Sequence, residues 1–355
     1  GGTMTPALSP TMWLRKNLFS TPLNSFLTLL GSGLLLLAIP SLLSWAFFEA
    51  VWSGASRVDC DGSEGACWAF VGHYFNQFLY HFYPADEQWR VNLAFGLLIA
   101  LVSGFWIPRL PQRWLVGALA FGFPVVAYWL FAGGVLGLPA VSSEDWGGFF
   151  ITLLLSIAGI ALSFPLGVLL ALGRRSHMPV IKALSVTYIE LIRGVPLISI
   201  LFMAAVMLPL FLPEGVNFNL LLRALVGIIL FSSALIAEVV RGGLQALPKG
   251  QYEAANALGL GYWRTMTLII LPQALRLVIP GLVNTFIALF KDTTLVMIIG
   301  LYDFLGRIQT AIREPSWGEI STEGYVFAAT VYWLCCFGMS RYSQHLERKL
   351  ERGYR

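Results

Sequence analysis

The residues of this sequence that could do chemistry are a few polar side chains inside long apolar stretches. In the stretch 274–300 they are Asn284, Thr285, Lys291 and Asp292. Thr285 and Asp292 are seven residues apart, so on a helix they share a face. A carboxylate inside a membrane is a functional-site hypothesis by default, and Asp292 could bind an amino group on the wall of a translocation path. Alternatively, Lys291 and Asp292 only neutralise each other or a charge on another helix.

A second polar interruption occurs in the stretch 220–245, where Ser232 and Ser233 are adjacent. These hydroxyls could face the same cavity as Asp292. Serine and threonine in membrane helices often bond to their own backbone, so the pair is weak evidence by itself. We therefore include both serines, with Asp292, Thr285 and Asn284, as candidate path residues.

Two acid–base pairs repeat along the chain, Glu190 with Arg193 and Glu238 with Arg241. Each base follows its acid by three residues, which places both on one helix face. The pairs could mark helix ends at which arginines reach toward lipid phosphates, or they could form a gate; Lys291 is a further candidate for such pairing. Charges at this depth are costly, so we expect their partners to lie close by.

Catalytic and cofactor motifs are absent from the sequence. No G-x-x-x-x-G-K-[ST] occurs, so the chain has no phosphate-binding loop for ATP. The four histidines have no metal-ligand spacing. No paired carboxylates, histidine cluster or Ser–His pair fall at one depth, which argues against a membrane enzyme. The sequence predicts a protein without its own cofactor, metal or catalytic residues.

The composition indicates that lipid is the solvent for most of the chain. Of 355 residues, 57% are hydrophobic and 12% are charged, with a mean hydropathy of +0.72. A helix needs about 20 apolar residues to span a bilayer. We expect an all-α integral membrane protein with eight transmembrane helices, at 26–48, 91–107, 115–138, 149–172, 183–212, 220–245, 274–300 and 324–343.

The basic residues predict the orientation of these spans. One set of alternating loops and tails contains 16 Lys and Arg, whereas the other contains only Arg57, Arg90, Arg307 and Arg313. By the positive-inside rule the first set is cytoplasmic. Both termini are therefore expected on the cytoplasmic side of a bacterial inner membrane. This asymmetry explains the net charge of +4 better than nucleic-acid binding does. Membrane lipid is the expected surrounding partner, and nucleic acid is not expected.

Loop composition predicts four parts. A cytoplasmic tail covers 1–25, three accessory spans with a long external loop at 49–90 cover 26–138, a five-span unit covers 139–346, and a cytoplasmic tail covers 347–355. Cys60 and Cys67 lie in the external loop, where a disulfide and two free thiols are equally compatible with the sequence. The external loop could dock a soluble partner.

The segment EAANALGLGYWRTMTLIILPQAL, residues 253–275, separates two apolar stretches on the predicted cytoplasmic side. Small residues at Ala254, Ala255 and Gly259 predict a short helix whose backbone other groups can approach closely. Pro272 has no N–H and suits the first turn of the next helix. The segment is therefore expected to protrude from the membrane and to offer a compact surface to another protein.

This segment resembles the EAA loop of bacterial ABC importer permeases of type I. The matching positions are Glu253, Ala254, Ala255, Gly259, Ile269, Leu271 and Pro272. The phrases ELIRGVPL at 190–197 and FKDTTL at 290–295 resemble the polar amino-acid uptake branch of that family. The resemblance covers the five-span unit with its loop at 246–275. The three leading spans resemble those of the longer permease of general L-amino-acid transporters.

The resemblance implies a permease subunit of an ATP-driven importer of L-amino acids. Such a complex contains two permeases, two ATPase subunits that bind ATP and Mg, and a periplasmic binding protein that delivers substrate. The EAA helix would be the coupling helix, seated in the ATPase. The added spans favour a heterodimer with a second, different permease.

Two alternatives remain open at this stage. Ala255 and Gly259 could instead make a small-residue contact between helices of the same chain. A secondary transporter or channel for small polar solutes is the alternative function, although its expected chain of mid-membrane acids or histidines is reduced here to Asp292.

Overall fold

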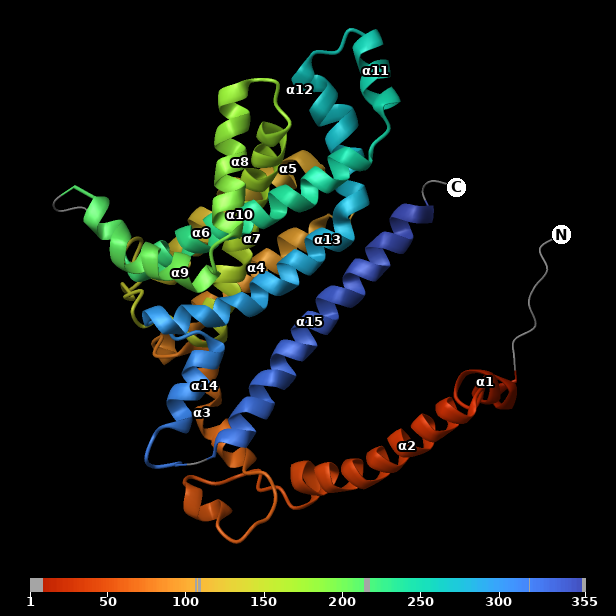
Figure 1. The fold of residues 1–355 in the computed structure, drawn as a ribbon. Coiled ribbons are helices and arrows are strands. Elements are labelled where there is room, and N and C mark those ends of the chain that lie inside the picture. The colour runs from red at the N-terminus through yellow and green to blue at the C-terminus, as the bar shows by residue number, and fades with distance from the viewer. Residues whose placement is uncertain (1–8, 106, 108–109, 214–217, 319, 353–355) are drawn as a thin grey trace. The chain divides into compact units, whose positions relative to one another are not determined.

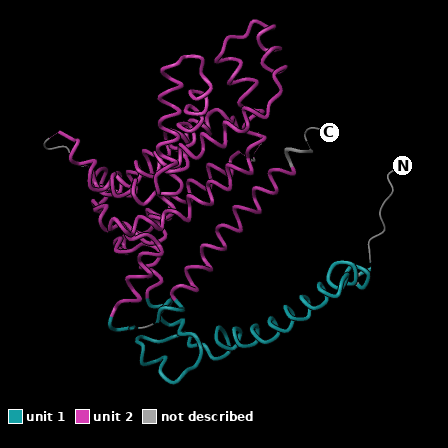
Figure 2. Tube along the Cα trace, in the orientation of Figure 1, with its two compact units in different colours: residues 1–73, 315–323 teal, residues 74–314, 324–355 magenta. Residues whose placement is uncertain are grey.

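The computed structural model describes residues 9–105, 107, 110–213, 218–318 and 320–352. In these ranges the chain is all-α and contains no β-strand. Its contacts divide it into two compact units, residues 1–73 with 315–323 and residues 74–314 with 324–355 (Figure 2). The beginning of the predicted N-terminal tail and the end of the C-terminal tail, residues 1–8 and 353–355, lie outside the described residues.

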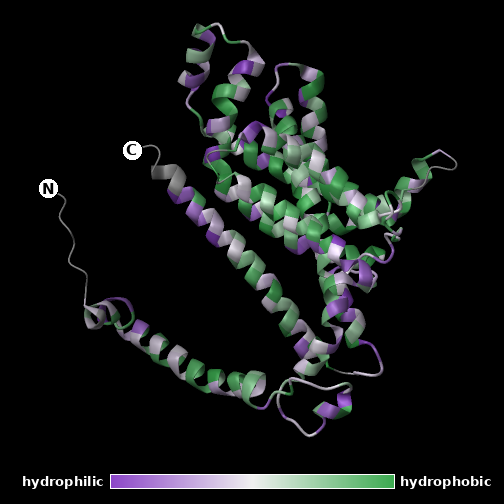
Figure 3. Cartoon of the chain, turned by 180° about the vertical axis from the view of Figure 1, so that it is seen from behind, coloured by the Kyte–Doolittle hydropathy of each residue, from purple (hydrophilic) through white to green (hydrophobic). Residues whose placement is uncertain are grey.

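The first unit is dominated by a long apolar helix. After α1 (Pro10–Asn17), α2 (Pro22–Leu43) continues through the π-helical turn η1 (Ser44–Phe48). Thr21 caps α2 by accepting a hydrogen bond from the Asn24 amide at 3.1 Å. The apolar part of this helix is 0% buried and is hydrophobic along its length (Figure 3). Its length and composition suit a membrane span, so α2 agrees with the span expected at 26–48.

The loop after α2 is closed by a disulfide. Cys60, in the turn η2 (Arg57–Cys60), bonds to Cys67 with their Cα atoms 5.8 Å apart. Trp52 and Trp68 lie with their ring centroids 6.1 Å apart, and the indole of Trp68 donates to the Ala46 carbonyl at 2.7 Å. Tryptophans of this kind are typical of a membrane–water interface. The structure thus resolves the pairing that the sequence left open.

The second unit is a helical bundle (Figure 1). Its elements, starting with the helix it shares with the first unit, are α3 (Trp68–Tyr80), η3 (Ala85–Glu87), α4 (Gln88–Gly104), α5 (Gln112–Gly117), η4 (Ala118–Gly122), α6 (Phe123–Ala132), α7 (Gly148–Arg174), α8 (Pro179–Arg193), α9 (Leu197–Phe202), η5 (Met203–Met207), η6 (Leu208–Phe211), α10 (Leu220–Ala246), α11 (Lys249–Ala257), α12 (Tyr262–Thr265), η7 (Met266–Ile270), α13 (Leu271–Asp292), η8 (Thr293–Ile299), α14 (Phe304–Ile312) and α15 (Ser321–Arg352). In Figure 1, α11 and α12 lie at one end of the bundle and α14 lies at the other. We call these the α11 end and the α14 end.

Helix α10 is the centre of the bundle and packs on α7, α8, α9 and α13. Glycines allow the closest approaches. A Cβ on Gly167 of α7 would lie 2.6 Å from the Ile236 side chain, and one on Gly243 would lie 2.6 Å from the Ala274 carbonyl oxygen of α13. At both positions a side chain larger than hydrogen would force the helices apart.

The membrane-length helices agree in part with the eight expected spans. Among the described residues, five stretches are long and apolar enough to cross a membrane: Pro22–Phe48, Gln112–Ala132, Gly148–Arg174, Leu220–Ala246 and Tyr262–Ile299. The continuous span expected at 183–212 is wrong, because α8 and the stretch Leu197–Phe211 meet at 105° and make a sixth only if counted together. Gly194 and Pro196 lie at this bend, and proline cannot continue the hydrogen-bond ladder. The expected 91–107 corresponds to α4, of only 17 residues, and 324–343 lies within α15.

Candidate functional site

The segment at the α11 end is a short helical hairpin with a glycine hinge. Pro248 precedes α11, whose nine residues end at Ala257, with Leu258 as the C-cap. Gly259 has a φ of +70°, in the left-handed region that favours glycine. Its amide donates to the Asn256 carbonyl at 2.9 Å, which satisfies an end group of the helix. A Cβ on Gly259 would meet nothing within 4 Å, so this position faces open space.

The predicted coupling residues of α11 divide between two faces. Glu253, Ala254 and Gly259 are exposed. Ala255 is 1% exposed, so it packs inward against its own chain. The intramolecular contact proposed as an alternative for Ala255 and Gly259 is therefore present at Ala255 and absent at Gly259.

Large apolar side chains at the tip of the hairpin were missed by the sequence analysis. Leu258 is 75% exposed, Trp263 is 62% exposed and Tyr262 is 50% exposed. In a chain this apolar, residue type alone does not separate a solvent-facing leucine from a core leucine. Exposed apolar groups on a protruding segment are typical of a surface that another protein covers.

The hairpin is joined rigidly to the next long helix. Leu271 and Pro272 stand in the first turn of α13, but the helix runs through η7 without a break, so Tyr262–Ile299 is one stretch of 38 residues. The amide of Gln273 donates to Gln251 Oε1 of α11 at 3.2 Å and to the Ile269 carbonyl at 2.9 Å. Gln273 thus links α11 to the first turn of α13.

Glu238 is the centre of a cluster of charges from three helices. Its carboxylate contacts Arg241 Nη2 at 2.9 Å, Arg174 Nη1 at 3.0 Å and Arg193 Nη1 at 3.4 Å. Arg174 also contacts Glu190 at 2.7 Å. We call these five residues the arginine cluster. It joins the end of α7, the end of α8 and the middle of α10.

In this cluster the expected Glu190–Arg193 pair does not form, and Arg174 takes part as an additional partner. The Glu238–Arg241 pair is present as spaced, but Glu190 pairs with Arg174 and Arg193 pairs across to Glu238. The reason is that the bundle brings three helices together, so shared acids bind arginines from neighbouring helices. The sequence indicated Arg174 only as a topology signal. Lys291 is exposed and has no ion pair among the described residues.

The polar residues of α13 form a half-open face. Asn284 is exposed, and Thr285 and Asp292 are half-buried. The hydroxyl of Thr285 donates to the Gly281 carbonyl at 3.0 Å. Asp292 makes no hydrogen bond or ion pair with any described residue, so mutual neutralisation with Lys291 by direct contact does not occur. Its carboxylate is available to a ligand.

Ser232 and Ser233 do not join this face. They are 1% and 0% exposed. Ser233 lies 3.0 Å from the Tyr188 hydroxyl of α8 and donates to the Leu230 carbonyl at 2.9 Å. The expectation that both serines line an open path is wrong for this chain, because these hydroxyls are buried between helices.

A tight junction at the α14 end was missed by the sequence analysis. A Cβ on Gly148, whose φ is +64°, would lie 2.5 Å from the Phe78 carbonyl oxygen, and one on Gly147 would lie 2.6 Å from His81 Cβ. The Gly148 amide donates to the Tyr302 carbonyl at 2.8 Å. We call Gly147 and Gly148, with Phe78, His81 and Tyr302 that they approach, the glycine junction.

Buried polar groups surround this junction. Arg307 of α14 is 3% exposed; it bonds to Gln77 of α3 and contacts Glu314 at 3.1 Å. Asp303 caps α14 by accepting from the Gly306 amide at 2.9 Å, and burial raises its pKa to about 6. Burial, assisted by the positive charge of Arg307, lowers the pKa of His81 to about 4.

A bundle of membrane-length helices with one exposed hairpin at its end defines the membrane subunit of a transport system. Residues 163–352 match the family described as the binding-protein-dependent transport system inner membrane component. The chain belongs to this family. The family assignment supports a permease that works with a separate ATPase over a secondary transporter or channel.

Two long relatives and one solved structure show how far the similarity extends. The chain is 57% identical over 346 residues to the inner membrane amino-acid ABC transporter permease protein YhdY of Escherichia coli, covering 96% of this chain and 93% of that one. It is 40% identical to the glutamate/glutamine/aspartate/asparagine transport system permease protein BztC of Rhodobacter capsulatus, covering 97% and 94%. A crystal structure of an amino acid ABC transporter with histidines matches 57% of this chain with 30% identity and a TM-score of 0.50.

Proposed function

We propose that the chain is the permease subunit of an ABC importer that takes up L-amino acids. The observation that supports this most is the exposed α11–α12 hairpin, which is bonded through Gln273 to the long helix bearing Asp292. The relatives YhdY and BztC, both named as amino-acid permeases, supply the substrate class. In this proposal the hairpin receives the motion of an ATPase and α13 passes it to the substrate path.

The path runs along the half-open face of α13. Asp292 and the exposed Asn284 are free to meet substrate, and the carboxylate suits the ammonium group shared by amino acids. Asp292 has no salt bridge with any residue that the structure describes, so a substrate does not have to displace one to reach it. Thr285, whose hydroxyl already donates to its own backbone, contributes an acceptor.

The assembly follows from what this chain lacks. The sequence has no phosphate-binding loop, so ATP and Mg bind to a partner ATPase. A periplasmic binding protein delivers the amino acid. A second, different permease completes the path, and the accessory helices of this chain distinguish the two halves of the heterodimer.

The proposed topology has eight spans with both termini in the cytoplasm of a bacterial inner membrane. It counts α4, the bent α8–α9 pair and α15 as spans, in addition to the five membrane-length stretches. The distribution of Lys and Arg supports it, because 16 of them fall on the side of the α11–α12 hairpin. The α14 end and the disulfide loop then face the periplasm.

Substitution of Gly259 tests the coupling role. Gly259→Glu places a bulky charge in the open space at the tip of the hairpin, and we expect it to abolish amino-acid uptake while the chain stays in the membrane. The matched control is Gly259→Asn, because asparagine tolerates the left-handed backbone without adding an acid, and it should retain uptake. Normal uptake by the glutamate variant would overturn the coupling role.

Substitution of Asp292 tests the path. Asp292→Ala should raise the substrate concentration that gives half-maximal uptake about tenfold, because one charge-assisted contact is lost. Basal ATP hydrolysis by the reconstituted complex should not change. If uptake by Asp292→Ala kept the wild-type affinity and selectivity, Asp292 would not belong to the path. Lys291→Ala is the control at the neighbouring position.

A further inference from the structure

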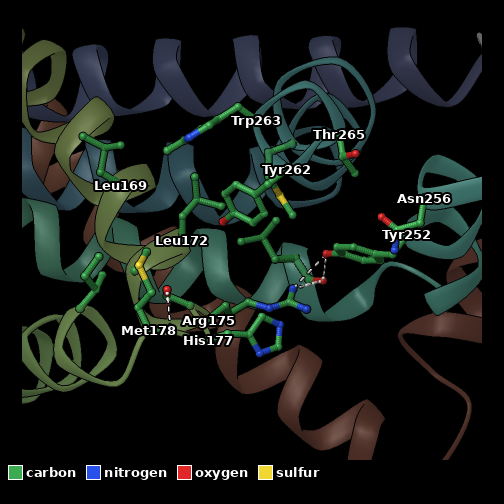
Figure 4. A pocket seen from close by; sticks show the side chains of 15 residues that line it. Leu169, Leu172, Arg175, His177, Met178, Tyr252, Asn256, Tyr262, Trp263 and Thr265 are labelled. Carbon is green, nitrogen blue, oxygen red and sulfur yellow. Dashed lines mark hydrogen bonds between the residues drawn. The ribbon is translucent and has the colours of Figure 1, made fainter. Parts of the chain in front are cut away.

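A cavity opens at the α11 end, beside the coupling hairpin and away from the polar face of α13 (Figure 4). Its volume is about 680 Å³, and its walls come from α7, α8, α10 and the α11–α12 hairpin. Drug-sized ligands occupy cavities of about 300–1,000 Å³. The cavity is therefore large enough for a substantial part of a lipid molecule.

The cavity extends from the apolar helices to the exposed hairpin. Leu169, Leu172 and Met266, which belong to membrane-length helices, line its inner part. Tyr262 and Trp263 line the part next to the hairpin. Aromatic residues with an apolar body and a polar edge prefer the depth of lipid headgroups, so the cavity lies where the inner leaflet meets the cytoplasm.

The lining carries one formal charge, the guanidinium of Arg175, and His177 adds a ring N–H donor. Arg175 and His177 line the cavity, and none of its lining residues is Asp or Glu. The guanidinium of Arg175 is held in place, since Nη1 donates to the Leu244 carbonyl at 2.6 Å and to the Tyr252 hydroxyl at 3.2 Å, and its plane lies 5.5 Å from the Tyr252 ring. Its Nε and Nη2 have no bond within the described chain. These two donors are positioned for an anion.

We propose that this cavity binds one anionic phospholipid of the inner leaflet. The phosphate contacts Arg175 and His177, the glycerol lies near Trp263, and an acyl chain follows Leu169 and Met266. Basic pockets between helices on the cytoplasmic side are known to favour anionic headgroups. An amino-acid substrate fits poorly, because its ammonium group would find no carboxylate and the apolar wall would stay uncovered.

The position of the site gives the lipid a role in transport. One wall belongs to the turn between α7 and α8, and the other belongs to the hairpin that meets the ATPase. A bound lipid fills the space between them and restrains the hairpin. Anionic lipid in the vesicle should therefore change the ATPase rate of the reconstituted complex, a consequence that rests on the proposed function; lipid binding itself does not.

The test measures lipid binding directly. The intact complex, in detergent, is titrated with phosphatidylglycerol or phosphatidylcholine, and bound lipid is counted by native mass spectrometry. We expect one preferred phosphatidylglycerol for each copy of this chain, and weaker phosphatidylcholine binding. The single variant Arg175→Gln should reduce the affinity about fivefold, since one Lys or Arg near a membrane contributes about 1 kcal/mol. The single variant His177→Gln removes a ring N–H donor and should reduce the affinity by a smaller factor. Arg264→Gln is the matched control, because Arg264 lies on the same hairpin but does not line the cavity.

A further variant guards against misfolding, because Arg175 also anchors the Leu244 carbonyl. Met178→Trp fills the cavity mouth without removing a charge and should displace the bound lipid, with an unchanged thermal unfolding midpoint. Equal affinity for the two lipids would overturn the proposal, as would full lipid binding in His177→Gln and Met178→Trp. Loss of the ATPase subunit in these variants, with lipid retained, would assign the cavity to the ATPase instead.

Discussion

The two ends of helix α7 are held in different ways. At its last residue, Arg174 binds Glu190 and Glu238, in a cluster whose side chains are between 14% and 53% exposed. At its first residue, Gly148 touches the Phe78 carbonyl and donates to the Tyr302 carbonyl, with no space for a side chain. The first attachment consists of ion pairs near water, and the second consists of backbone against backbone.

This difference indicates which end of the helix can move. Partly exposed ion pairs can exchange one partner for another or for water at a cost of about 1 kcal/mol each. Close backbone packing does not deform gradually and is lost only by separating the segments. We therefore expect the glycine junction to act as the fixed end, or pivot, of α7, and the arginine cluster to be the end that rearranges if the α11–α12 hairpin moves.

The largest predicted effect is at the pivot. Gly148→Ala combines a left-handed backbone with a clash against the Phe78 carbonyl, and should cost about 3–5 kcal/mol of stability. The thermal unfolding midpoint of the purified complex measures it. The control is Gly242→Ala on α10, where a Cβ would meet nothing within 4 Å and the midpoint should not fall. If the two variants had equal thermal unfolding midpoints, Gly148 would not be held by close backbone packing, and the proposed difference between the two ends of α7 would be wrong.

The next effect is the response of the pivot to acid. His81 is 7% exposed and its pKa is lowered to about 4, so the folded chain keeps it neutral while the unfolded chain protonates it near pH 6.5. The contribution of His81 to stability is therefore lost as the pH falls from 6.5 to 4, by a total on the order of 3 kcal/mol. His81→Asn, which tolerates the φ of 60° at this position, should remove that loss.

Asp303 changes stability with pH in the direction opposite to His81. Its pKa is raised to about 6, so the folded chain binds a proton more readily than the unfolded chain, and its contribution to stability increases as the pH falls from 6 toward 3.8. In His81→Asn the unfolding midpoint should therefore rise between pH 6 and pH 4. His345→Asn, at an exposed position of α15, should keep the wild-type pH profile. A wild-type profile in His81→Asn would refute the assignment.

Much of the α11 end was predictable from sequence, because its signals are local. The spacing of Glu253, Ala254 and Gly259 predicted a short helix ended by glycine, and the structure contains α11 and a left-handed Gly259. The Glu238–Arg241 pair is three residues apart on one helix, so spacing alone was sufficient.

The α14 end was not predictable, because its contacts join segments far apart in sequence. Gly148 meets Phe78, and Arg307 meets Gln77, across 70 and 230 positions. A glycine pair after a tryptophan gives no sign of what it will touch. The wrong assignments have the same origin: Ser233 is polar in an apolar helix whether it faces a path or bonds to Tyr188, and only the packing of α8 on α10 decides.

A smaller effect is predicted at the centre of the arginine cluster. Glu238→Gln removes the charge shared by Arg174, Arg193 and Arg241, and should cost about 2 kcal/mol, since the acid is only 14% exposed. If the cluster is a gate, basal ATP hydrolysis without binding protein should rise in the reconstituted complex. If the arginines only contact lipid phosphates, stability and basal hydrolysis should both stay at the wild-type level.

The smallest effect is predicted for Glu190→Gln, which tests whether the acids of the arginine cluster contribute unequally to stability. Glu190 is 53% exposed and its one partner, Arg174, keeps Glu238 at 3.0 Å after the change. Water screens so exposed a pair, so the loss should stay within about 0.5 kcal/mol and basal hydrolysis should not change. Glu238→Gln makes the same chemical change in the same cluster, so the two variants can be compared directly. Thermal unfolding measures the stability of each variant, and an ATPase assay measures its basal hydrolysis. A loss at Glu190 as large as that at Glu238 would mean that the cluster acts as one rigid unit, and that α7 is then fixed at both ends.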